Sequence, residues 1–162
     1  MTYDDYKDEI ELSIIQNGGV EIELYSIIAD IIRNGKNSHS ISLRDVSSRR
    51  TSNISKRYKG DGGFPDFVVF AREKLESAEI LGCIEAKRPS TELDLKSEQI
   101  KLHIDSYHKV IYTNGLQWVF YNHSDSPVEN IVIGRKLQDN SIEWCESTEW
   151  KNLCDYIGSI KW

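Results

Sequence analysis

The sequence has few cysteines and lacks the motifs of zinc proteins, nucleotide-driven motors and methyltransferases. The three cysteines, Cys83, Cys145 and Cys154, do not have zinc-site spacing, and we expect them to be reduced in a cytoplasmic protein. There is no glycine-rich Walker loop and no methyltransferase cofactor motif. Helicase, methylation or target-recognition functions would therefore have to come from methyltransferase, helicase or specificity subunits on other chains, or from sequence outside these 162 residues.

Long apolar runs are also missing. No run approaches the roughly 20 residues that cross a membrane, and the acidic segment 1–9 is unlike a signal peptide. We therefore expect no membrane partner and a cytoplasmic location. At 162 residues, the chain is predicted to form a single domain over 1–162, with one hydrophobic core.

The most informative pattern is Pro65-Asp66 followed by an apolar run, and then Glu85 and Lys87 in a second apolar run. Proline is tolerated at the start of a strand, and strand alternation puts Glu85 and Lys87 on one face. Carboxylate oxygens suit Mg²⁺, and a lysine can hold the attacking water or the phosphate. Either fragment alone is common in turns and exposed strands, so the prediction of a metal site depends on the combination.

Pro65-Asp66, an apolar hairpin and Glu85-x-Lys87 together resemble the PD-(D/E)xK nuclease superfamily. Gln99 and the segment 113–121 are similar to the helix and hairpin that follow Glu-x-Lys in nuclease domains of restriction systems, including type I restriction subunits and methyltransferase-fused restriction enzymes. Asn114-Gly115 between two apolar runs is the preferred two-residue hairpin turn. The resemblance spans roughly residues 20 to 121.

The resemblance implies an α/β fold with a restriction-endonuclease-like core, in which helices flank a mixed central sheet. It implies Mg²⁺, with Mn²⁺ as a substitute, and hydrolysis of DNA in the restriction of foreign DNA. In this interpretation Lys87 positions the nucleophilic water or stabilises the phosphate, and Gln99 orients that group. The implied catalytic residues are Asp66, Glu85, Lys87, Glu21 and Gln99, and the implied metal ligands are Asp66, Glu85, Glu21 and the backbone carbonyl of Ala86.

Glu21 is favoured over Glu23 by helical periodicity. Glu21 shares one helical face with Leu24, Tyr25, Ile28 and Ile32, whereas Glu23 projects elsewhere. The alternative is a first-turn glutamate that only interacts with the helix dipole.

His103 stands where related domains often carry tyrosine, four residues after the glutamine. We predict a helix-surface or packing residue rather than a catalytic base, because such nucleases take their proton chemistry from metal-bound water.

Basic residues gather in one segment of an otherwise acidic chain. Residues 44–59 hold six basic side chains and one acid, a local charge of +5, although the chain has a formal net charge of −6. This asymmetry favours nucleic-acid binding, and the alternative is a solvated loop. The predicted DNA-binding residues are Arg44, Arg49, Arg50, Lys56, Arg57 and Lys59.

Periodicity and turn residues predict the order of the elements. The expected helices are 3–15, 20–33, 93–107 and 144–160. The expected strands are 40–46, 66–71, 80–87, 110–113, 117–121 and 131–136.

Three alternatives to a DNA nuclease stay open at this stage. The chain could be a non-catalytic DNA-binding module, an assembly module of a restriction complex, or a structure-specific or RNA nuclease. Intact Asp66, Glu85 and Lys87 favour catalysis. Double-strand cleavage would require either a homodimer or sequential nicking, and the sequence does not decide between them.

Overall fold

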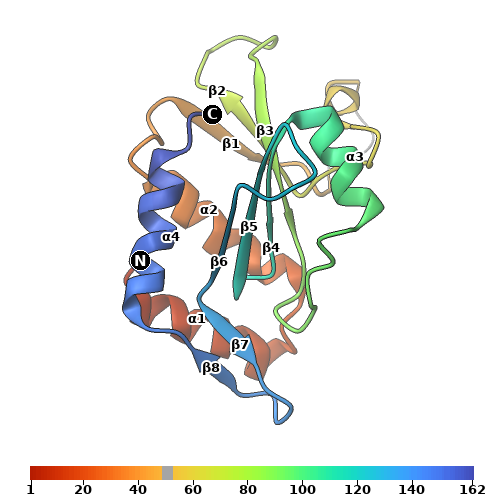
Figure 1. Cartoon of the computed structure of the whole chain (residues 1–162). Coiled ribbons are helices and arrows are strands. Elements are labelled where there is room, and N and C mark those ends of the chain that lie inside the picture. The colour runs from red at the N-terminus through yellow and green to blue at the C-terminus, as the bar shows by residue number, and fades with distance from the viewer. Residues whose placement is uncertain (49–52) are drawn as a thin grey trace.

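A six-stranded sheet forms the centre of the computed structural model, which describes residues 1–48 and 53–162 (Figure 1). The strands of this sheet lie in chain order, and every neighbouring pair is antiparallel except β3 and β4, which are parallel and joined through α3. The six strands are β1 (Ile41–Asp45), β2 (Phe67–Ala71), β3 (Ile80–Ala86), β4 (Lys109–Thr113), β5 (Gln117–Asn122) and β6 (Glu129–Val132).

Helices cover both faces of this sheet. The helices are α1 (Tyr3–Asn17), α2 (Leu24–Asn34), α3 (Glu98–Tyr107) and α4 (Ser147–Ser159), with 3₁₀ turns η1 (Glu21–Glu23) and η2 (Ser55–Tyr58). No helix among the described residues is long and apolar enough to cross a membrane. The predicted fold class, an α/β restriction-endonuclease-like core with a mixed central sheet between helices, is confirmed.

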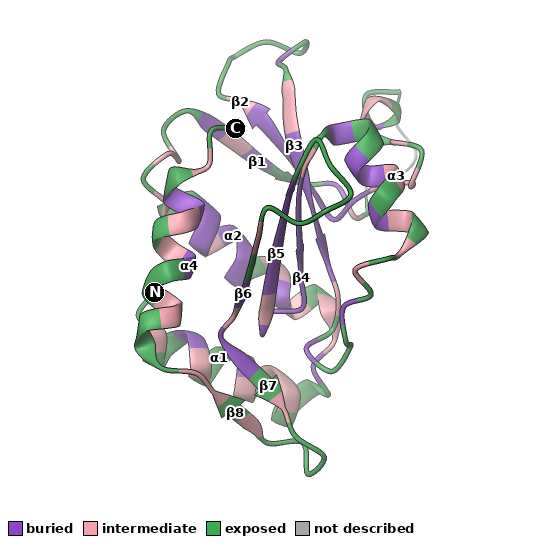
Figure 2. Ribbon diagram, viewed as in Figure 1, coloured by how far each residue is buried: buried purple, intermediate pink, exposed green. Residues whose placement is uncertain are grey.

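Strand alternation divides the core into two layers. In β3, Ile84 and Ala86 pack with α1, α2 and α4, whereas Cys83 faces the opposite layer under α3. Figure 2 shows the central strands buried along most of their length. A charged residue between Ile84 and Ala86 must therefore point into the α3 layer, and this is the position of Glu85.

The predicted start of the helix after β3 is wrong. Residues 94–97 form a turn instead of helix, because the Asp94 side chain accepts a hydrogen bond from Lys96 N (2.9 Å) and the Asp94 carbonyl accepts one from Ser97 N (3.1 Å). An aspartate that bonds its own downstream backbone competes with helix formation. The helix therefore starts at Glu98 and places Gln99 in its first turn.

The predicted strand 131–136 is two strands in two different sheets. Leu116 O accepts hydrogen bonds from both Ile133 N (2.9 Å) and Gly134 N (3.2 Å), so the chain bends away from the central sheet there. Beyond the bend, β7 (Gly134–Lys136) pairs with β8 (Ile142–Trp144). The final helix consequently starts at Ser147 rather than at Trp144.

The β4–β5 hairpin exists, but its turn is shifted by one residue from the predicted Asn-Gly centre. Gly115 and Leu116 are the central residues, since Asn114 N bonds Gln117 O (3.3 Å). Gly115 has φ +83°, which glycine adopts without strain, and Asn114 Oδ1 accepts from Leu116 N and Gln117 N. Asn114, the first residue of the turn, thus stabilises it through these side-chain hydrogen bonds.

Candidate active site

The ends of β2 and β3 bring the two predicted carboxylates together. Phe67 pairs with Ile84, so the register places Asp66, immediately before β2, directly across from Glu85. Directly opposed residues share a face, and this face looks toward α3. Asp66 and Glu85 are only 9% and 4% exposed. Two buried carboxylates side by side need compensating partners.

Both oxygens of Asp66 have protein partners. Oδ2 accepts a hydrogen bond from Ala86 N (2.7 Å), and Oδ1 accepts one from the Tyr25 hydroxyl. Burial, followed by the charge of Glu85, raises the pKa of Asp66 to about 6, despite the opposing effect of these two hydrogen bonds. The carboxylate form of Asp66 is therefore held in an unfavourable environment when no cation is present.

Glu85 is held more firmly in its ionised form. Its Oε1 accepts hydrogen bonds from Lys87 Nζ (2.6 Å) and Gln99 Nε2 (3.0 Å). Burial acts to raise the pKa of Glu85, but the contacts with His103 and Lys87 prevail and lower it. Burial acts to lower the pKa of Lys87, and Glu85 more than reverses this effect, so the lysine stays charged.

His103 is a site residue that the sequence interpretation missed. It is fully buried, as the packing alternative predicted, but its Nε2 lies 3.5 Å from Glu85 Oε2. No described residue forms a hydrogen bond of good geometry with that oxygen or with either ring nitrogen. The i, i+4 spacing from Gln99 on α3 is the signal that could have placed both side chains beside Glu85.

A glycine turn closes over His103. A Cβ on Gly62 would lie 2.8 Å from Gln99 O and 2.9 Å from His103 Nδ1, closer than real Cβ atoms approach such groups. Only glycine lets the turn pack this tightly against α3, so Gly62 helps to exclude solvent from the buried side of Glu85.

Glu21 lies at the edge of the same group. Its carboxylate is 3.5 Å from the Tyr25 hydroxyl, which also contacts Asp66. Burial raises the pKa of Glu21, with Lys87 opposing and Glu85 adding to the shift. Glu23 instead accepts a hydrogen bond from Asn17. Of the two glutamates, the structure therefore places Glu21, the one that periodicity favoured, beside Asp66 and Glu85.

The donor atoms of this group fit a hard divalent cation. Glu85 Oε2 is a buried carboxylate oxygen without a hydrogen-bond donor among the described residues, and Asp66 and Glu21 are neighbouring carboxylates that interact with Glu85 by charge. The described residues contain no ready-made group of three Asp, Glu, His or Cys side chains around one point. Asp66 would have to exchange its Tyr25 contact for the cation.

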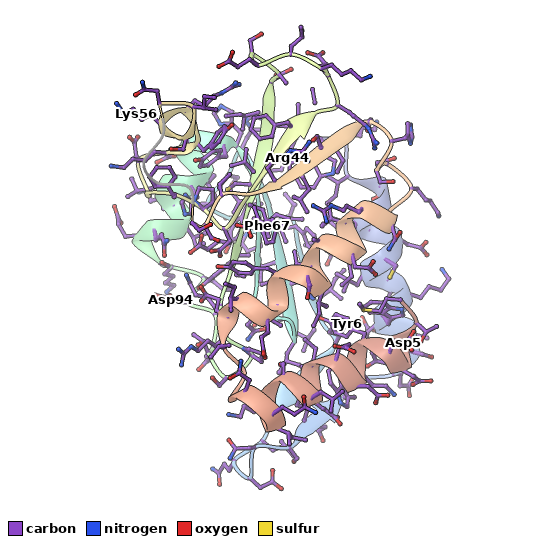
Figure 3. The ribbon with its side chains drawn as sticks, turned by 180° about the vertical axis from the view of Figure 1, so that it is seen from behind. Asp5, Tyr6, Arg44, Lys56, Phe67 and Asp94 are labelled. Carbon is purple, nitrogen blue, oxygen red and sulfur yellow. The ribbon has the colours of Figure 1, made fainter. Side chains whose placement is uncertain are left out.

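The predicted DNA-binding residues that the structure describes come from β1 and from the η2 turn and its end, and Arg44 and Arg57 line one hollow between these elements. Figure 3 shows Arg44 on β1 and Lys56 in the η2 turn at separate places, and Arg49 and Arg50 lie outside the described residues. Arg57 is half-buried and donates hydrogen bonds to Glu76 O and to Ala78 O (2.7 Å). Lys56 and Lys59 are exposed.

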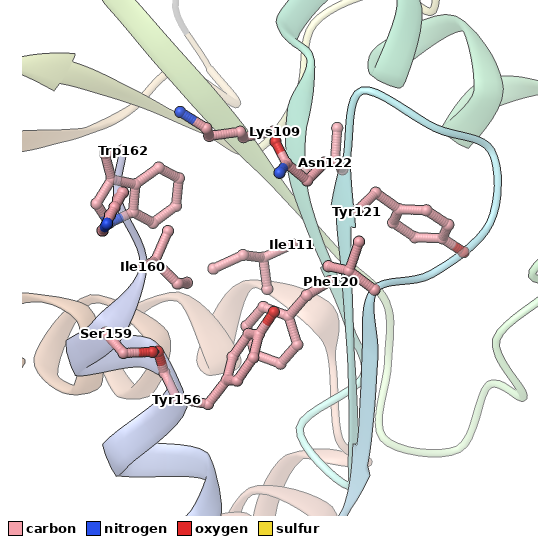
Figure 4. A pocket seen from close by; sticks show the side chains of 12 residues that line it. Lys109, Ile111, Phe120, Tyr121, Asn122, Tyr156, Ser159, Ile160 and Trp162 are labelled. Carbon is pink, nitrogen blue, oxygen red and sulfur yellow. The ribbon is translucent and has the colours of Figure 1, made fainter.

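A hollow of about 250 Å³ lies away from these residues, where the ends of β4 and β5 meet the end of α4 (Figure 4). Ile111, Phe120, Tyr156 and Trp162 line it, and its lining contains no carboxylate. It is therefore not a candidate for the metal site.

The fold and the carboxylate–lysine group define an α/β domain with a restriction-endonuclease-like core. No family model and no curated protein matches the sequence. Among solved structures, the chain is similar to a cryo-EM structure of a DrdV–DNA complex, with a TM-score of 0.61, 12% sequence identity and coverage of 98% of this chain. The match covers 14% of the DrdV chain, and at this identity it shows the fold alone.

Proposed function

We propose that this domain is a metal-dependent nuclease that hydrolyses DNA phosphodiester bonds, and that it acts in the restriction of foreign DNA. The observation that carries the proposal is the convergence of Asp66, Glu85 and Lys87 where the interior strands β2 and β3 end, two of them buried and all three connected by hydrogen bonds or charge. The similarity in fold to a protein solved with DNA supports the choice of substrate. The restriction setting comes from the motif resemblance.

Asp66 and Glu85 would hold the cation, with the Ala86 carbonyl and Glu21 as further oxygen donors. A bound Mg²⁺ would lower the pKa of a water molecule and neutralise charge on the phosphate. Lys87, charged and fixed 2.6 Å from Glu85, would orient the attacking water or stabilise the charge that develops on the phosphate. Gln99 keeps Glu85 in place by its hydrogen bond to Oε1.

The decisive experiment compares cleavage and binding in the same variants. We expect Asp66→Asn and Glu85→Gln to abolish cleavage of plasmid DNA with Mg²⁺ or Mn²⁺. Lys87→Ala should lower the single-turnover rate by roughly a hundredfold, the scale of one lost electrostatic stabiliser, while DNA affinity in Ca²⁺ changes far less. Asp105→Asn and Lys101→Ala change exposed residues of α3 outside the group and should retain wild-type rates.

Near wild-type cleavage by either carboxylate variant would disprove the assignment of the site. If the wild type cuts neither duplex, branched nor single-stranded DNA or RNA, and Lys87→Ala only weakens binding, the protein is a binding or assembly module. Cleavage of RNA or of branched DNA alone would leave the site as proposed and change the substrate.

A further inference from the structure

A groove of about 580 Å³ runs beside β1, the edge strand of the sheet. Three segments bring basic side chains to it: the end of α2, β1 itself, and the residues that follow β2. The charged residues of its lining are Arg33, Arg44, Arg72, Lys74 and Glu73. Only Arg44 belongs to the basic segment that the sequence indicates.

The four cations are exposed, and Arg44 and Arg72 each donate one hydrogen bond to a backbone carbonyl, Leu43 O and Ser38 O. None of them forms an ion pair with a described residue, whereas Lys36, Lys87 and Lys151 do. The chain has more acidic than basic residues, with a formal net charge of −6. The lack of ion pairs in the groove is therefore not caused by a shortage of carboxylates in the chain. Four unpaired cations against one carboxylate give this groove a positive potential that attracts an anion.

The exposed backbone of β1 adds hydrogen-bonding groups to the groove. Arg72 N donates to Ser40 O, and Val46 N donates to Asp66 O. In β1 the backbone N–H and C=O groups of the even-numbered residues therefore point toward β2. The backbone groups of Ile41 and Leu43 therefore point toward the open edge, because bonding alternates along an antiparallel strand. Their N–H groups can donate to phosphate oxygens.

An added β-strand fits this edge poorly. Arg44 Nη1 donates to Leu43 O (2.9 Å), so one of the acceptors that a partner strand would need is already occupied. Arginine and lysine along an edge also oppose strand addition between proteins. Four cations that three separate segments bring to one groove suit an extended polyanion better than a single small anion.

We propose that this groove binds the phosphodiester backbone of duplex DNA beyond the nuclease site, an inference that takes its ligand class from the proposed function. Asp45 pairs with Phe67, next to Asp66, and Ile41 lies four residues further along β1, roughly 13 Å at about 3.3 Å per residue. The near end of the groove is Arg44, two residues along β1 from Val46, whose N–H bonds Asp66 O, and from there the groove runs along the edge strand away from the carboxylate group. It contacts flanking phosphates and carries no residue of the reaction.

The test compares Arg33→Ala/Lys74→Ala with Arg135→Ala/Lys161→Ala, which removes one arginine and one lysine from exposed positions elsewhere. The probe is a fluorescein-labelled 30-base-pair duplex, with binding followed by anisotropy in Ca²⁺ over a salt series. Losing two phosphate contacts should weaken binding and reduce the slope of log affinity against log salt by about 2. The control pair should keep the wild-type slope, and circular dichroism verifies that each variant is folded.

Charge reversal provides a second variant, since Lys74→Glu should weaken binding more than Lys74→Ala. If the slope of log affinity against log salt is unchanged in the groove variants while the wild type still cuts DNA in Mg²⁺, the groove does not bind DNA and the nuclease proposal remains intact. A reduced slope in a protein that cuts nothing would support the groove and reject the nuclease. A change in self-association without any change in DNA binding would show that a protein partner occupies this edge, and would overturn the proposal.

Discussion

Asp66 shows how one residue is kept in an unfavourable ionisation state by its neighbours. The strand register sets it opposite Glu85, and the buried setting raises its pKa above the usual 3.8 to about 6. Tyr25 and Ala86 donate to it without fully compensating. A cation between the two carboxylates would remove this penalty, which is why the same arrangement that destabilises the metal-free protein favours metal binding.

We therefore expect Asp66→Asn to stabilise the metal-free protein. Between about pH 4 and pH 6 the folded state binds more protons at Asp66 than the unfolded state, so wild-type stability falls as pH rises through this window and stays lower above it. Asparagine removes this loss and should raise the free energy of unfolding at pH 7 by on the order of 1–3 kcal/mol, with no gain below about pH 4. Urea unfolding in EDTA at both pH values measures the difference.

Asp105→Asn is the matched control, because Asp105 is exposed on α3. The free energy of unfolding of Asp105→Asn should be close to that of the wild type at both pH values. A destabilised Asp66→Asn at pH 7 would contradict the view that the buried charge is costly.

At the scale of elements, Arg57 holds the η2 turn against the connection between β2 and β3. Besides its hydrogen bonds to Glu76 O and Ala78 O, its guanidinium lies 5.6 Å from the Phe70 ring and 5.9 Å from the Tyr58 ring. These contacts engage both terminal nitrogens of the guanidinium and fix it against the protein surface. The structure thus gives Arg57 a role in folding that Lys56 and Lys59 lack.

Arg57→Ala should lower the free energy of unfolding by about 1–3 kcal/mol, the range for hydrogen bonds from a charged group, and change the salt dependence of DNA binding little. Lys56→Ala/Lys59→Ala should show the reverse pattern. Arg57→Lys should recover only part of the stability, because an ammonium cannot reproduce the planar fork. Chemical denaturation together with a DNA-binding salt series separates the two effects; a large loss of slope in Arg57→Ala alone would assign this residue to DNA instead.

The whole molecule is expected to respond to metal through its stability. The carboxylate group forms only when η1, β2, β3 and α3 are assembled, so a cation bound there favours the folded state. At a hundredfold excess of Mn²⁺ over its dissociation constant, the stabilisation is about 2.7 kcal/mol, or roughly 5–10 °C in melting temperature for a domain of this size. Thermal unfolding with and without Mn²⁺ measures it independently of cleavage.

The shift should vanish in Asp66→Asn and Glu85→Gln and persist in Asp105→Asn. An equal shift in all four proteins would mean that the ion binds elsewhere on this acidic chain. This measurement also separates loss of metal from loss of chemistry in Lys87→Ala, which should keep its shift.

The sequence by itself determined the central strands and the faces of their charged residues. Alternation has a period of two within each strand, so Glu85 and Lys87 share a face in any sheet that buries Ile84 and Ala86. Turn chemistry marked the hairpin at Gly115, although not which two residues occupy its centre, because the side chain of Asn114 decides this through hydrogen bonds that a dipeptide pattern does not show.

The tertiary structure alone decided which distant residues meet. His103 reaches Glu85 because α3 crosses over β3, Arg57 is directed to carbonyl oxygens about twenty residues further on, and the basic groove gathers side chains from three segments. Backbone carbonyls have no sequence signature, and contacts between remote segments leave none in a single sequence. Local periodicity can therefore predict the strands and the shared face of Glu85 and Lys87, whereas the residues that surround these two follow only from how strands and helices pack together.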